Sequence, residues 1–232
     1  MIFFPTFQVS PEGCRTVIFH HRSDSTFTRL YREEVEIAFS AMDCVLKHEK
    51  AINASAELTT GRRLYDALRE CHVKTAVDLK ALKGQDWFTA NVWDANVRSA
   101  RDFAAQVREK VGGTILVITP APFSAPGWTQ PEYLAFWEQL LRTRISSTWF
   151  KAGWQYSDGC TSEFAVSADA GLPTLDQEGN PLSVREAAEF IDVAIRDLDS
   201  CGFDTTKLRE NLARLHAIDL RAQQLKSAAT AH

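Results

Sequence analysis

The stretch ISSTWFKAGWQYSDGCTSEFAVSADAGLP, residues 145–173, decides the predicted fold. It opens with β-branched and aromatic residues, passes through a turn that contains glycine, and continues as a helix rich in small residues that stops at Gly171 and Pro173. A buried strand that runs through a turn into a helix is the repeating element of α/β folds with a parallel sheet. The stretch therefore predicts an α/β domain.

The surrounding segments repeat this alternation of strands and helices. Further strands are predicted at 73–79, 113–119 and 172–176, and helices at 99–110, 132–144 and 183–200. Continuous apolar strands that alternate with amphipathic helices indicate a parallel sheet. We therefore expect a Rossmann-like α/β domain over residues 73–205, with helices on both faces of its sheet. A C-terminal helix and a frayed tail are expected at 206–232.

The first 72 residues have a different pattern. Two β-rich runs at 2–9 and 15–21 flank the turn sequence SPEGC, which indicates a β-hairpin. Apolar residues then recur at helical spacing over 29–52, and a second helix is predicted at 57–71. Residues 1–72 are therefore expected to form an N-terminal extension, a hairpin plus two helices, that replaces a missing loop of the α/β domain, covers a site or makes an oligomer interface.

The composition of the 232 residues excludes several classes of function. The formal net charge of −4 at pH 7 argues against a nucleic acid polymer as the main partner, since that role favours a basic surface. The N-terminus lacks the basic start and apolar core of a signal peptide, and no apolar run approaches the roughly 20 residues that span a bilayer. Five scattered cysteines without a Cys-x-x-Cys pair favour reduced thiols and predict no metal site. We therefore expect a cytoplasmic protein with neither a membrane nor a metal as partner.

The turn at 157–163 has the features of a ligand site. In an open parallel sheet, ligands bind where strands end and helices begin. Gly159 lets the backbone approach a ligand closely, and the first N–H groups of the new helix attract a phosphate or a sugar hydroxyl. The alternative is that Ser157 or Asp158 simply caps the helix and that Glu163 favours its positive end. The local pattern leaves both interpretations open.

Three segments follow one another between residues 97 and 176: TILVITPAPF, EYLAFWEQLL and the long stretch quoted above. The long stretch contains a Gly-Trp-x-x-Ser-x-Gly-x-x-x-Glu pattern, with Gly171-Leu-Pro after it in register. The residues of the pattern are Gly153, Trp154, Ser157, Gly159 and Glu163. This series resembles the nucleoside 2-deoxyribosyltransferase-like superfamily, and most closely a small group that shares the pattern.

The resemblance implies cleavage of an N-glycosidic bond in a nucleoside, nucleotide or related ribosyl compound, by hydrolysis or by transfer of a (deoxy)ribosyl group. Glu163 would attack the anomeric carbon and expel the base, forming a covalent glycosyl–glutamate intermediate. Ser157 would hold a 5′-phosphate or a sugar hydroxyl. The other residues of this binding turn are Asp158, Gly159, Cys160 and Thr161. No cofactor is implied, and because family members often complete their active sites across subunits, a homo-oligomer, a dimer or larger, is expected.

Glycosidic chemistry of this kind usually employs a second carboxylate, which protonates the leaving base or orients the nucleophile. Glu138 of AFWEQLL falls where the superfamily has an aspartate, so the resemblance implies that role for it. The alternative is an exposed helix glutamate. Trp128 and Trp154 are candidates for stacking on a base, although burial is the commoner fate of tryptophan.

Two departures from the superfamily pattern keep a second function open. The Gly-Pro loop that normally follows the first strand is missing, with only Lys83-Gly84 in the corresponding region, and Ser146 stands where an aspartate is common. The alternative function is a non-catalytic nucleotide-binding or sensing module on the same fold. A free Glu163 carboxylate that faces an open pocket favours the enzyme, and one buried against an arginine favours the module.

Overall fold

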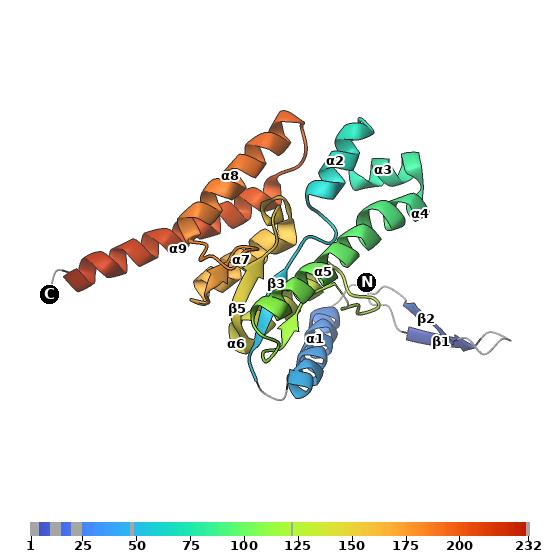
Figure 1. The fold of residues 1–232 in the computed structure, drawn as a ribbon. Helices are drawn as coiled ribbons and strands as arrows, with labels where there is room; N and C mark the ends of the chain where they lie inside the picture. The colour runs from blue at the N-terminus through green and yellow to red at the C-terminus, as the bar shows by residue number, and fades with distance from the viewer. Residues whose placement is uncertain (1–4, 10–14, 20–24, 47–48, 122, 231–232) are drawn as a thin grey trace.

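The computed structural model describes residues 5–9, 15–19, 25–46, 49–121 and 123–230. Its centre is a four-stranded sheet in which all neighbouring strands are parallel, in the order β4-β3-β5-β6 (Figure 1). The strands are β3 (Ala51–Ser55), β4 (Val117–Ile118), β5 (Ile145–Phe150) and β6 (Thr174–Leu175). The predicted α/β fold with a Rossmann-like parallel sheet is confirmed.

Helices cover both faces of this sheet. Ile52 and Ala54 of β3 pack against α5 (Asp94–Lys110) on one face. Asn53 lies between them in sequence and points to the opposite face, where it hydrogen-bonds to a side chain of α7 (Asp158–Asp169). Because successive side chains of a strand alternate between faces, one short strand contributes to two different layers.

The remaining helices surround this centre, as Figure 1 shows. They are α1 (Ser25–Leu46), α2 (Arg62–Glu70), α3 (Ala76–Lys83), α4 (Gln85–Phe88), α6 (Gln130–Arg144), α8 (Val184–Ser200) and α9 (Thr206–Thr230). A π-helical turn at Thr89–Trp93 joins α4 to α5, and a 3-10 turn at Trp154–Tyr156 precedes α7. Helix α6 packs against α1 and α7, and α9 packs against α7 and α8 before its C-terminal end extends beyond the body of the molecule.

The predicted N-terminal hairpin is confirmed within the described residues. Strand β1 (Pro5–Val9) pairs antiparallel with β2 (Arg15–Phe19), and α1 follows. The predicted runs at 2–9 and 15–21 extend beyond the described residues at 2–4 and 20–21. In Figure 1 the hairpin lies to the right of the sheet and apart from it.

The central strand β3 differs from the sequence prediction. The apolar pattern predicts a helix that continues to residue 52, whereas α1 ends at Leu46 and β3 begins at Ala51. The strand is short and contains Asn53 and Ser55, and neither residue type favours strands by itself. The sheet therefore takes its central strand from the segment 1–72 that the sequence assigns to an extension.

The strand predicted at 73–79 is also wrong. Thr75 instead caps α3, since its side chain accepts a hydrogen bond from the N–H of Asp78. Asp78 adds a negative charge to the first turn, which the helix N-terminus favours. The capping signal therefore outweighs the short apolar run.

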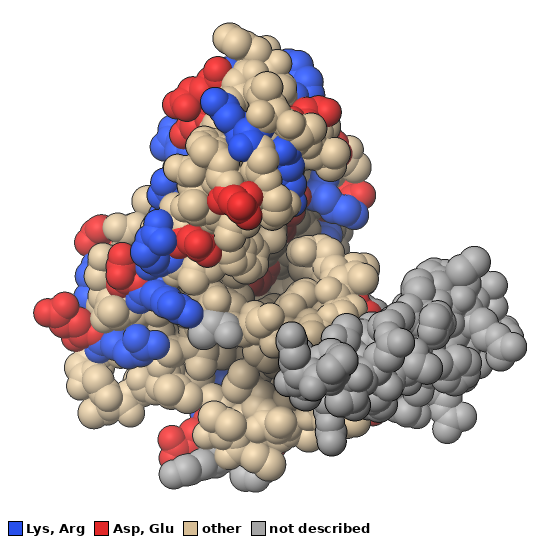
Figure 2. Space-filling view, turned by 90° about the vertical axis from the view of Figure 1, so that its right-hand side faces the viewer, with Lys and Arg blue, Asp and Glu red and all other residues tan. Residues whose placement is uncertain are grey.

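One face of the molecule is shown in Figure 2. Lysine and arginine side chains are interspersed with aspartate and glutamate over its upper part and down its left side. This mixture differs from the basic stripe with which proteins bind a nucleic-acid backbone. Within the described ranges, no helix combines the length and apolar character needed to cross a membrane.

Candidate functional site

A cavity of about 650 Å³ lies at the carboxyl edge of the sheet. Its wall includes residues that follow three of the strands, namely Ala56 after β3, Ala121 after β4 and Ser157 after β5. The chain passes from β3 to β4 on one side and from β5 to β6 on the other, so the strand order reverses between β3 and β5. Ligands of open parallel sheets bind at such a reversal.

Glu163 of α7 lines this cavity, although only 8% of the residue is exposed. Asn53 Nδ2 on the central strand donates a 3.0 Å hydrogen bond to Glu163 Oε2. Burial raises the pKa of the Glu163 carboxyl, while the neighbouring Ser55 and Asn53 side chains act to lower that pKa. Among the described residues no other hydrogen bond to this carboxylate has good geometry, so Oε1 has no hydrogen-bond donor there.

Four buried side-chain atoms near the cavity have no hydrogen-bond partner among the described residues. They are Asn53 Oδ1, Ser55 Oγ, Glu57 Oε2 and Thr119 Oγ1. All four belong to β3 or to the residues just after β3 and β4. Ser55 lies close enough to Glu163 to lower its pKa, yet its hydroxyl falls short of hydrogen-bond geometry. Buried polar atoms without partners are rare in folded proteins, and they mark places arranged for water, a ligand or chemistry.

The first turn of α7 forms another part of the wall through Ser157, Gly159 and Cys160. Ser157 also caps the helix, since its Oγ accepts a 3.4 Å hydrogen bond from the Cys160 N–H. Capping and cavity lining therefore occur together at this serine. Burial raises the pKa of the Cys160 thiol, so this cysteine is a neutral wall residue and not a nucleophile.

Two predicted binding residues of the same turn, Asp158 and Thr161, do not line the cavity. The Thr161 hydroxyl donates to the Ser157 carbonyl at 3.0 Å and accepts a 2.9 Å hydrogen bond from Asn211 Nδ2 of α9. The Asp158 N–H donates to Thr60 Oγ1, and burial raises the pKa of the Asp158 carboxyl to about 6. Both residues therefore bind α7 to neighbouring segments of the chain. The sequence had predicted contacts between these two residues and a substrate.

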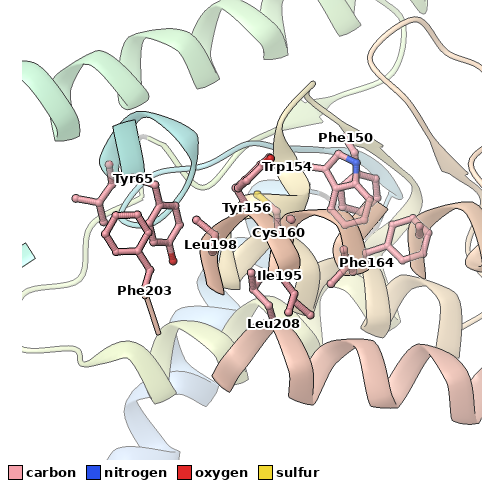
Figure 3. Close-up of a cluster of buried hydrophobic side chains, with 14 of the residues drawn as sticks. Tyr65, Phe150, Trp154, Tyr156, Cys160, Phe164, Ile195, Leu198, Phe203 and Leu208 are labelled. Atoms are coloured by element: carbon pink, nitrogen blue, oxygen red, sulfur yellow. The ribbon is translucent and has the colours of Figure 1, made fainter. Parts of the chain in front are cut away.

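Neither predicted tryptophan lines the cavity. Trp154 belongs to the buried cluster of Figure 3, where its ring stacks on Phe164 with 5.0 Å between centroids. Trp128 packs against Tyr133 with 5.4 Å between centroids. Packing, the alternative role, therefore describes both. The aromatic residues that do line the cavity are Trp93, Phe123, Tyr133 and Trp137.

Glu138 lines the same cavity from α6. The two carboxylates that the resemblance pairs thus line one cavity. The Glu138 side chain is 45% exposed and forms a 3.0 Å ion pair with Arg142, one turn further along the helix. Arg142 is held in turn by Asp169 of α7 at 2.9 Å. Glu138 is therefore both an exposed helix glutamate and a cavity residue.

Several residues that lie beside the cavity or line it were not predicted. Asn53 and Ser55 lie on β3, a strand that was not predicted from the sequence. Apolar and polar residues nevertheless alternate strictly along INASAE at 52–57, and such alternation is a strand signal. Arg101 of α5 and Arg214 of α9 also line the cavity, and neither has an ion-pair partner among the residues described. Nothing local distinguishes these arginines, because each is one of many charges on an exposed helix face.

The arrangement places the Glu163 carboxylate in a wall that also contains aromatic and cationic side chains. Over the described ranges, no three His, Cys, Asp or Glu side chains gather as a metal site. Glu163 lines the cavity and has no arginine partner in the described chain, and its carboxylate is largely buried and held by Asn53. Comparisons with protein-family models, with curated proteins and with solved structures found no match.

Proposed function

We propose that the protein cleaves the N-glycosidic bond of a nucleoside, nucleotide or related ribosyl compound, with Glu163 as the nucleophile. The observation that carries the proposal is a buried carboxylate, held at one oxygen by Asn53, in the wall of a cavity of about 650 Å³. That volume lies within the range of small-molecule sites. The resemblance of residues 97–176 to the nucleoside 2-deoxyribosyltransferase-like superfamily supports the same chemistry.

The reaction proceeds in two steps. A Glu163 oxygen attacks C1′ of the sugar, the C1′–N bond breaks, and its electron pair leaves with the base. The transition state resembles an oxocarbenium ion, which the negative carboxylate stabilises and then captures as a glycosyl ester. Water then attacks C1′, the ester bond breaks, and the proton of the water passes to the solvent as Glu163 is regenerated. A second base in place of water would give transfer of the sugar.

The leaving base takes up a proton as it departs, and Glu138 is the second carboxylate assigned to this step. It lines the cavity, and its ion pair with Arg142 holds it on the α6 wall. General acid catalysis of this kind typically contributes about 10²–10⁴-fold in rate.

The cavity also offers groups that suit the other parts of a nucleotide. Aromatic side chains such as Trp93 provide faces on which a base stacks. The first turn of α7 and Arg214 suit a phosphate. Arg214 follows Asn211 by three residues, so the two share a face of α9, and Asn211 contacts Thr161 in the first turn of α7. We therefore expect a bound phosphate at Ser157–Thr161.

A non-catalytic nucleotide-binding module is the second candidate, and one observation favours it. Burial raises the pKa of Glu163, and a protonated carboxyl would donate a hydrogen bond to a ligand and could not attack a sugar. The two functions differ in a measurable way. Both bind a nucleoside or nucleotide, but only the enzyme releases a base.

The proposal includes a cytoplasmic homo-oligomer, a dimer or larger. Large apolar side chains exposed on α8 and α9 provide contact surface, among them Phe190, Val193 and Leu225. Light scattering of the purified protein tests this part. A monomer mass at micromolar concentration would contradict it and would leave the assignment of Glu163 unaffected.

The experiment that tests the function is incubation with a panel of nucleosides, nucleoside monophosphates and NAD, followed by chromatography for the released base. We expect release from at least one compound by the wild-type chain and none by Glu163→Gln. Crystals soaked with nucleoside monophosphates locate the ligand. Binding without release in the wild type would favour the module, and density only outside the cavity would overturn both candidates.

A further inference from the structure

We propose that Asn53 is a positioning residue for Glu163: it ties down Oε2, keeps the carboxyl in its charged form and leaves Oε1 as the oxygen that attacks. The inference rests on the proposed function. It assigns a role to a residue of β3, the strand that was not predicted from the sequence. Asn53 itself touches neither the cavity nor a substrate, since it is absent from the lining.

The first support is the rigidity of the donor. Asn53 is fully buried, and its Nδ2 lies 3.0 Å from Glu163 Oε2. Its backbone sits in the middle of the sheet, opposite Ile118 of β4 on one side and Thr148 of β5 on the other. A donor fixed on both flanks restricts the carboxylate to one orientation and costs no reorganisation when the reaction begins. Only Oε1 then remains to meet C1′.

The second support concerns which groups favour the negative charge of the Glu163 carboxylate. Burial works against ionisation of Glu163, and the groups that favour the charged form are the Asn53 and Ser55 side chains. Lysine and arginine do not bond to this carboxylate anywhere in the described chain. A neutral amide favours the carboxylate without neutralising it. The ionised nucleophile therefore carries the full negative charge that an oxocarbenium-like transition state requires.

The alternative is that Asn53 only satisfies a buried polar group. A second buried hydrogen bond between the sheet and α7 allows a comparison with the Asn53–Glu163 bond. Thr148 Oγ1 of β5 lies 2.9 Å from Ser167 Oγ, and both residues are fully buried. This bond joins the neighbouring strand to the same helix, α7, but it does not involve Glu163. Loss of this bond is therefore expected to change the stability of the fold without changing the surroundings of Glu163.

The test compares Asn53→Ala and Asn53→Asp with Thr148→Val as the matched control. Asn53→Ala removes the amide donor and Asn53→Asp replaces it with a second carboxyl, and we expect turnover at the acid end of the pH profile to fall about 10- to 100-fold, the worth of one hydrogen bond to a charged group. The acid limb should move to higher pH while KM changes little. Thr148→Val should lower the melting temperature and leave the shape of the pH profile unchanged. A wild-type pH profile in both Asn53 variants would overturn the proposal.

A second measurement does not depend on turnover. Infrared difference spectra of ¹³C-glutamate-labelled protein report the protonated carboxyl band, and the band missing from Glu163→Gln identifies Glu163. We expect that band to persist to higher pH in the Asn53 variants than in the wild type and in Thr148→Val. If no base is released by any chain, the proposed function fails while this spectrum still decides the role of Asn53. An unchanged band would remove that role even in an active enzyme.

Discussion

Glu163 and Glu138 are the same residue type on two walls of one cavity, and the structure treats them in opposite ways. Glu163 on the α7 wall is 8% exposed and is held by a neutral amide from the central strand. Glu138 on the α6 wall has a side chain that is 45% exposed, and a cation one turn away holds it. The chemistry of a carboxylate therefore depends on its surroundings more than on its presence in a cavity.

The difference extends to the neighbours of each wall. Burial also raises the pKa of Asp158, which lies at the start of α7 outside the cavity lining, to about 6, in the same direction as the pKa of Glu163. On the α6 side, Arg142 bridges Glu138 and Asp169 at the surface. Reactivity is thus expected from the α7 wall, and support or proton supply from the α6 wall. Four substitutions test this division.

The largest effect is expected from Glu163→Gln. The amide keeps the shape of the side chain but cannot supply a negative charge or form a glycosyl ester, so base release should fall by several powers of ten, with each tenfold worth about 1.4 kcal/mol of barrier. Ligand affinity should remain, and thermal stability should change by about 1 kcal/mol. On the same variant, chromatography measures base release, calorimetric titration measures ligand affinity, and thermal melts measure stability. Wild-type turnover would end the assignment of Glu163 as nucleophile.

A smaller loss is expected from Glu138→Gln. Removal of a general acid should slow turnover by about 10²-fold, the lower end of the usual range, because water reaches this half-exposed site and replaces part of the function. Asp192→Asn is the matched control, since Asp192 forms the same kind of ion pair with Arg196 one turn along α8. Equal rates for these two variants would show that Glu138 is only a surface residue.

Arg214→Gln should act on binding. If Arg214 contacts a phosphate, its loss should weaken binding of a nucleoside monophosphate about tenfold and leave the affinity for the matching nucleoside unchanged. Arg221→Gln is the control on the same helix, because Arg221 is paired with Asp169 and does not line the cavity. Titration calorimetry with both ligands measures the contrast. An equal loss for nucleoside and nucleotide would remove the phosphate contact.

The smallest effect is expected from Asp158→Asn, on stability alone. Because the pKa of Asp158 is raised from 3.8 to about 6 in the folded protein, the folded state binds this proton more tightly than the unfolded state does. Stability from this group should therefore fall as the pH rises from about 4 to about 6, by roughly 1–2 kcal/mol after allowance for the favourable helix dipole. Asp158→Asn should abolish that fall in urea unfolding curves. The same pH slope in both chains would point to another group.

The two walls also differ in how far the sequence reveals them. Strand β5 and helix α7 are predicted correctly in type and order, because an apolar strand, a glycine turn and a serine cap stand together in one continuous stretch. Glu163, Ser157 and Gly159 follow from that stretch, and the structure places all three in the cavity wall. Local signals are sufficient where one segment carries both the element and the functional residues.

Strand β3 shows where such signals end. Its five residues are buried on both faces by other elements, so its stability comes from pairing with β4 and β5 and not from its own composition. Asn53 therefore could not be assigned to the site without the sheet. The same holds for Trp154, which was predicted to stack on a base and lies in the core, because burial of an aromatic ring depends on helices far away in sequence.

Strand β3 has a consequence for how the protein can change. Valine at position 53 or 55 would suit a central strand better and would remove Asn53 Oδ1 or Ser55 Oγ, two of the buried atoms that lack a partner. Laboratory selection for heat resistance alone is therefore expected to accumulate substitutions at these positions, and selection for turnover to reject them. Substitutions that raise thermal stability and substitutions that raise turnover would then exclude one another at positions 53 and 55.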